Sequence, residues 1–145
     1  MARRLLVVAA MSSILCLCGV ASAAPPEGSL RLTLVQSGEF APLGPRSFSF
    51  DHTVYQRGQI TGTSHAVCRF TGNFENPRCR ITFAVPQGKL FLFIRLVPDP
   101  RGSFTVTGGT GAYRGRTGVG IFRDLNAEGT VTRIVIWLTS QRMPR

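Results

Sequence analysis

Apolar and polar residues alternate with a period of two along most of this chain. Leu30, Leu32 and Leu34, for example, are separated by polar residues. This period is typical of strands that bury one face. We expect such strands over residues 30–36, 48–54, 58–70, 79–85, 89–97, 104–107, 119–124 and 130–139. The second of them is weaker, and we expect it to bend at Asp51 and His52.

Turn residues separate these strands, and no segment after residue 23 keeps an apolar stripe at helical spacing over three turns. About eight strands joined in sequence predict an all-β fold, a single closed antiparallel up-and-down β-barrel, with a two-sheet sandwich as the alternative. The stretch 60–70 places small residues on one face, as a crowded barrel interior requires. Glycines and prolines between Gly38 and Arg46 predict an irregular loop over one barrel end.

The first 23 residues have a different composition. Arg3 and Arg4 precede an apolar run from Leu5 to Val20, and Ala21-Ser22-Ala23 fits a cleavage site. This order of segments predicts a signal peptide over residues 1–23 and one β-barrel domain over residues 24–145. The apolar run is too short for a membrane span. We therefore expect a secreted protein, either extracellular or periplasmic.

The chain is strongly basic, with 17 Lys and Arg against 7 Asp and Glu. Without Arg3 and Arg4, 15 basic residues remain, so the net charge of the exported chain would be about +8. The arginines are scattered and few aromatic residues lie among them, which favours a solvated surface over a specific nucleic-acid interface.

Removal of residues 1–23 would also leave only two cysteines, Cys68 and Cys79. The segment between them reads as a hairpin, so we expect a disulfide across paired strands.

The only other residues that commonly bind zinc through nitrogen are His52 and His65, and with two cysteines they would make a poor zinc site. We therefore expect no metal.

A glycine cluster follows the strand at 104–107 and includes Gly108, Gly109 and Gly111. Glycine tolerates positive φ and close backbone approach, so this cluster predicts a tight turn that carries Tyr113 and Arg114 at a barrel rim. No nucleotide-binding spacing is present, because no Gly-Lys-Ser/Thr or following helix completes the motif.

The stretch from Thr107 to Gly120 resembles the Gly-Gly-Thr-Gly-x-Phe/Tyr turn of the allene oxide cyclase and dirigent barrel family. Together with this turn, the strand at 62–68 and the strand of Cys79 resemble exported bacterial members. The resemblance extends over about residues 30–138 and implies a shaped cavity without a cofactor, used for cyclising an oxylipin epoxide or for guiding radical coupling. It also implies a trimer or dimer, for which outward-facing Phe91 and Phe93 are candidates. Ala112 and Arg116 stand where dirigent proteins often have other residues, so no catalytic residue carries over.

Candidate ligand contacts are Tyr113, Arg114, Phe122 and Asp124. If Phe122 faces the lumen, Asp124 faces it too, near the mouth of the barrel. A carboxyl there would be partly desolvated and would serve as a general acid. The competing interpretation is an exposed residue at the end of a strand. We expect a lumen that binds a small hydrophobic molecule. Two roles stay open: cofactor-free cyclisation or isomerisation of that molecule, and a non-catalytic module for ligand binding or surface interaction.

Overall fold

The computed structural model describes residues 28–72 and 75–140, and the predicted signal peptide lies outside them. The elements follow the chain as β1 (Ser29–Gln36), β2 (Ala41–Gly44), β3 (Ser47–Gln56), β4 (Gln59–Arg69), β5 (Arg78–Val85), β6 (Gly88–Arg95), β7 (Arg101–Gly109), the helical turn η1 (Gly111–Tyr113), β8 (Arg116–Asp124) and β9 (Val131–Ser140). In this part of the chain, no helix has the length and apolarity needed to cross a membrane.

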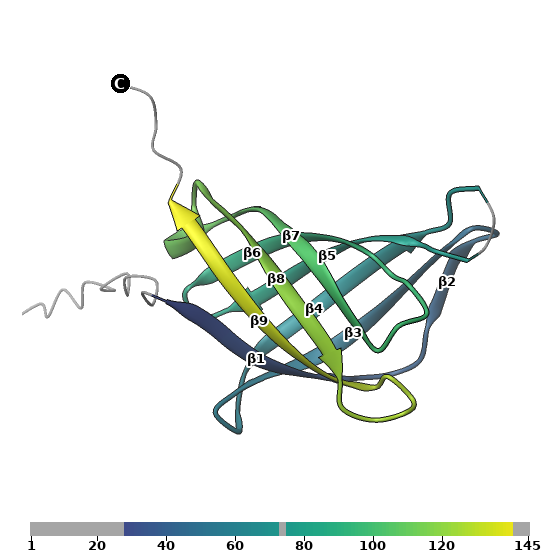
Figure 1. Ribbon diagram of the computed structural model, residues 1–145, viewed down its shortest axis with the longest axis horizontal. Helices are drawn as coiled ribbons and strands as arrows, with labels where there is room; N and C mark the ends of the chain where they lie inside the picture. Colours follow the sequence, from purple (N-terminus) through teal and green to yellow (C-terminus); the bar gives the residue numbers. More distant parts are fainter. Residues whose placement is uncertain (1–27, 73–74, 141–145) are drawn as a thin grey trace, which may run out of the picture.

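Eight of the strands form a closed antiparallel barrel (Figure 1). Each strand from β3 to β8 pairs with the next one in sequence, β9 pairs with β1, and β1 pairs with β3 to close the cylinder. The all-β barrel predicted from the alternating pattern is therefore confirmed. Closure leaves none of these eight strands with an unpaired edge over its whole length.

The irregular loop predicted between Gly38 and Arg46 is wrong in part, because β2 forms there. Ala41 and Pro42 pair with Ser49 and Phe48 of β3, and the register shifts before Gly44. Proline is tolerated in this position because β2 pairs only with β3, so its outer edge needs no N–H donor. This short strand extends one end of the barrel beyond the closed cylinder (Figure 1).

Alternation places the apolar set inside. The buried core includes Leu30, Leu32 and Leu34 of β1 together with inward residues of six other barrel strands, and Phe122 of β8 packs against it partly buried. On the outer face, Phe91, Phe93 and Trp137 are 37%, 39% and 42% exposed. Their outward direction agrees with the pattern, and the self-association we expect of Phe91 and Phe93 stays a prediction.

The expected disulfide is present between Cys68 and Cys79. These residues are direct partners in the β4–β5 ladder, with Cα atoms 4.0 Å apart, and both side chains are completely buried. The hairpin therefore brings the two sulfurs together within the barrel interior, as the spacing predicted.

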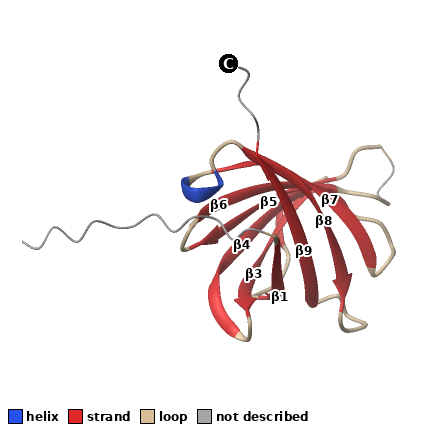
Figure 2. Cartoon of the chain, turned by 60° about the vertical axis from the view of Figure 1, so that its left-hand side comes forward, coloured by secondary structure: helices blue, strands red, loops and turns tan. Residues whose placement is uncertain are grey.

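The glycine turn after β7 closes one end of the barrel, and η1 (blue in Figure 2) lies beside the start of β6. Ala112 N donates to Gln87 O and Thr110 N to Lys89 O, which ties this turn to the β5–β6 turn. The three glycines differ in role. Gly111 has φ +60°, and at Gly109 a Cβ would lie 2.5 Å from Lys89 O.

The expectation that Gly108 adopts a positive φ or lies close to neighbouring backbone is wrong. Its φ is not positive, and the nearest atom to an added Cβ is 3.9 Å away. The reason is that Gly108 still lies within β7, opposite Phe91, before the chain turns. Close approach by neighbouring backbone begins one residue later, at Gly109.

Candidate functional site

The opposite end of the barrel contains a cavity of about 290 Å³, near the lower limit for small-molecule sites. The loops β1–β2, β6–β7 and β8–β9 surround its mouth, at the right-hand side of Figure 1. Most of its wall is apolar, and its aromatic residues are Phe40, Phe48, Phe50, Phe83, Phe104 and Phe122. The polar side chains that line it are Gln36, His52, Asp99, Asp124 and Thr132.

Three phenylalanines form an aromatic cluster on one side of the mouth. Phe48 and Phe50 alternate inward from β3 and stack at 6.0 Å between ring centroids. Phe40 comes from the β1–β2 loop and contacts both rings edge-on, at 5.6 and 5.1 Å. Phe40 is 57% exposed. An exposed ring held against two inner rings is a ready contact for the flat face of a ligand.

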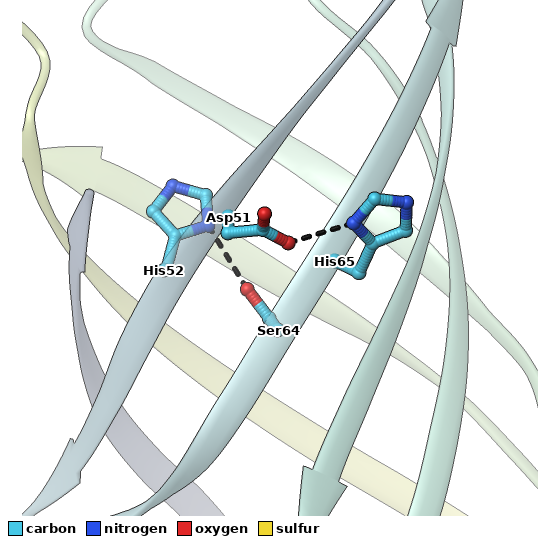
Figure 3. A network of polar contacts seen from close by, with 4 residues as sticks. All are labelled: Asp51, His52, Ser64 and His65. Atoms are coloured by element: carbon cyan, nitrogen blue, oxygen red, sulfur yellow. Dashed lines mark hydrogen bonds and ion pairs between the residues drawn. The ribbon is translucent and has the colours of Figure 1, made fainter. Parts of the chain in front are cut away.

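His52 follows this cluster on β3 and points into the barrel (Figure 3). Its Nδ1 forms a hydrogen bond of 2.9 Å with the Ser64 hydroxyl of β4, and its ring meets that of Phe50 edge-on. Burial lowers the pKa of His52 below its usual 6.5, and the nearby Asp51 opposes this shift. A neutral imidazole at neutral pH follows, and its Nε2 has no hydrogen-bond partner among the described residues.

A second polar pair lies on the outside of the same two strands. His65 Nδ1 and Asp51 Oδ1 are 2.7 Å apart, and both side chains are more than half exposed. Figure 3 shows the two pairs side by side, because Asp51 pairs with His65 and His52 pairs with Ser64 in the β3–β4 ladder. Since neighbouring residues of a strand point to opposite faces, only the His52 pair belongs to the cavity.

Asp124 lies at the end of β8, half-buried in the cavity wall. Its Oδ1 accepts a hydrogen bond of 2.7 Å from Thr132 Oγ1, its partner in the β8–β9 ladder. The following turn is held by Asn126, whose side-chain oxygen accepts from Val131 N at 2.9 Å. The carboxylate is therefore fixed by backbone pairing and by one hydroxyl.

The four predicted ligand contacts fall at two different ends of the barrel. Phe122 and Asp124 line the cavity. Tyr113 is instead 1% exposed and packs in the core at the closed end, and Arg114 next to it is exposed. Tyr113 and Arg114 lie far from the cavity because they precede β8, whereas Phe122 and Asp124 lie at its end. The nine extended residues of β8 span roughly 27 Å.

The sequence did contain a signal for His52, which we did not predict as a cavity residue. Phe48, Phe50, His52 and Val54 continue one alternation, so His52 shares their inward face. The bend expected at Asp51 and His52 hid this, since β3 continues through both residues to Gln56. In residues 28–72 and 75–140, no group of three or more His, Cys, Asp or Glu side chains could hold a metal ion.

The lowered pKa of His52 predicts a specific pH dependence of stability. A folded pKa below the unfolded value means that the unfolded chain binds more protons, so the free energy of unfolding should fall as pH drops below about 6.5. Urea denaturation of the wild type and of His52→Gln between pH 8 and pH 5 measures this. The wild type should lose more stability over this interval than the variant, and equal losses would contradict the prediction.

Among the comparisons with known proteins, the one with solved structures identifies the fold. The sequence matches no protein-family model and no curated protein. Among solved structures, a pyocyanin demethylase superposes with a TM-score of 0.66 at 18% identity, over 77% of this chain and 100% of that one.

Two pterocarpan synthase dirigent proteins give TM-scores of 0.59 and 0.60, each at 14% identity. The first match covers 81% of this chain and 88% of the dirigent chain. The second covers 80% of this chain and 96% of the dirigent chain. At these identities the likeness is one of fold, and the fold of this chain is a dirigent-like β-barrel.

Proposed function

We propose that this protein binds a small hydrophobic molecule in the cavity at the open end of its barrel. The observation that carries the proposal is the cavity itself, about 290 Å³ with six phenylalanines in its wall. A concave, mostly apolar site with a few convergent polar groups is the usual form of a small-molecule site. The structural neighbours are named after the compounds pyocyanin and pterocarpan, which supports a small ring-containing ligand.

A fluorescent probe tests the binding. N-phenyl-1-naphthylamine, a neutral apolar fluorophore, should brighten on entering the cavity. Ile81→Trp, which places an indole in the cavity wall, should weaken this binding at least about tenfold by occupying the space. Thr105→Trp adds the same group on the exposed outer face and is the control. Equal binding by both variants would show that the probe binds elsewhere and would remove the proposal.

A second candidate function is cofactor-free isomerisation or cyclisation of the bound molecule, and His52 favours it. A neutral imidazole with an unpartnered Nε2 in an apolar cavity is suited to accept a proton. Asp124 lies in the same wall and would serve as a second polar group or as a general acid. The shape of the cavity would contribute by holding the reacting atoms in one geometry.

Solvent isotope exchange distinguishes catalysis from binding alone. Ligand extracted from the protein would be incubated with it in D₂O and examined by mass spectrometry. Catalysis by proton transfer should give a product or a deuterated ligand with the wild type, and at least about a hundredfold less with His52→Gln. No exchange and no product with the wild type would leave binding as the function.

We further propose that the chain is exported and cleaved after Ala23. The Cys68–Cys79 disulfide supports this, since such bonds persist in oxidising compartments. Intact-mass measurement of protein from the extracellular or periplasmic fraction should give a chain that begins at Ala24 and lacks two thiol hydrogens. Recovery only of the uncleaved chain, with all four of its cysteines as free thiols, would overturn export.

A further inference from the structure

The charges in the cavity wall have the opposite sign to the charge of the protein. The chain has 17 Lys and Arg and only 7 Asp and Glu. Yet the two charged residues in the wall are both acidic, Asp99 and Asp124, and none of the described Lys or Arg residues lines it. Arg123 and Arg133, next to cavity residues in sequence, are exposed on the outer face. Strand alternation therefore keeps the cations outside while the mouth holds two carboxylates.

Neither carboxylate is ion-paired with a Lys or Arg among the described residues. The ion pair between Asp51 and His65 lies on the outer face and includes neither of them. Asp124 uses Oδ1 to accept from the Thr132 hydroxyl, and Asp99 uses Oδ1 to accept from the backbone N–H of Arg101. Each Oδ2 has no donor among the described residues. His52, a neutral imidazole 7% exposed, adds a further unpartnered nitrogen, Nε2.

The rest of the wall also suits a cation. Phe40, Phe48 and Phe50 present ring faces and edges at the same mouth, and the face of an aromatic ring attracts a positive charge. An anion would meet two like charges, the exposed Asp99 and the half-buried Asp124, and near Asp124 the Coulomb repulsion is stronger than in water. A neutral molecule would gain the apolar contacts without either electrostatic effect.

We propose that the cavity selects a small organic cation, an aromatic or alkyl-rich molecule with a positively charged nitrogen, over a neutral or anionic molecule of the same shape. The charged nitrogen would lie at the mouth near Asp124 and Asp99, and the apolar part would lie deeper, toward Phe104 and Leu92. This inference rests on the proposed function and names the ligand class for the same cavity.

Three probes of matched shape test the selection. They are N,N,N-trimethyl-2-naphthylammonium, 2-tert-butylnaphthalene and 2-naphthalenesulfonate, each assayed by displacement of N-phenyl-1-naphthylamine at low and at physiological salt. The cation should bind about tenfold or more tightly than the anion, with the neutral probe between them. If the neutral probe displaces the dye but the cation binds no better than the anion, the charge selection is wrong and the binding function stands. If none of the three displaces the dye, both fail.

Isosteric variants identify the source of the preference. Asp124→Asn keeps an oxygen that accepts from Thr132 and removes the charge, so the ratio of cation to neutral affinity should fall about fivefold or more. Glu128→Gln removes an exposed carboxylate from the same β8–β9 turn and should leave the ratio unchanged. Asp99→Asn is the second test should Asp124→Asn fail to fold. If Glu128→Gln lowers the ratio as much as the cavity variant does, the preference comes from the general surface field and the proposal is overturned.

Discussion

Replacing Tyr113 by alanine should lower the free energy of unfolding by about 3 to 5 kcal/mol, the usual cost of deleting a large buried aromatic ring. Tyr113 is 1% exposed and belongs to the core at the closed end of the barrel, where burial also raises its pKa. Urea denaturation measures the loss. Arg114→Ala, at the exposed neighbouring residue, should change stability by less than about 0.5 kcal/mol.

The same variant tests whether Tyr113 closes the barrel or gates a ligand. Because the cavity lies at the other end, Tyr113→Ala should bind N-phenyl-1-naphthylamine as the wild type does under conditions where both are folded. Weakened binding with little loss of stability would contradict the role in closing the barrel. It would restore the expectation that Tyr113 contacts the ligand.

Gly109→Val should destabilise the protein by about 3 kcal/mol or more, because the barrel end has no room for a side chain there. A Cβ at this position would lie 2.5 Å from Lys89 O and 2.6 Å from Tyr113 Cβ. Neither atom can move without shifting β6 or displacing the buried ring. Thermal unfolding followed by circular dichroism measures the effect.

Gly108→Val is the matched control for this prediction. Gly108 is the preceding residue, its nearest contact to an added Cβ is 3.9 Å away, and a β-branched residue suits a strand. The free energy of unfolding of Gly108→Val should stay within about 1 kcal/mol of the wild-type value. Equal losses from the two valines would show that the glycine cluster acts through general chain flexibility, and not through close packing at Gly109.

Much of the barrel could be predicted because strand periodicity is a local property. The alternation in Leu30–Leu34 and in 89–97 predicts which residues face inward, and the structure places them so. The Cys68–Cys79 pair followed from hairpin geometry in the same way. β2 could not be predicted, because its pairing depends on β3 accepting an additional edge strand next to Pro42, which no pattern within residues 38–46 encodes.

By itself, the sequence determined the alternation along the strands, their up-and-down order and the paired cysteines, because all of these depend on neighbours along the chain. Only the tertiary structure decided which end of the barrel is open. Tyr113 fills one end because η1 folds against the β5–β6 turn, whereas the loops at the other end leave a cavity beside His52 and Asp124. These two residues lie 72 positions apart in the chain and share one wall because β1 pairs with both β3 and β9, a consequence of closure that local periodicity does not contain.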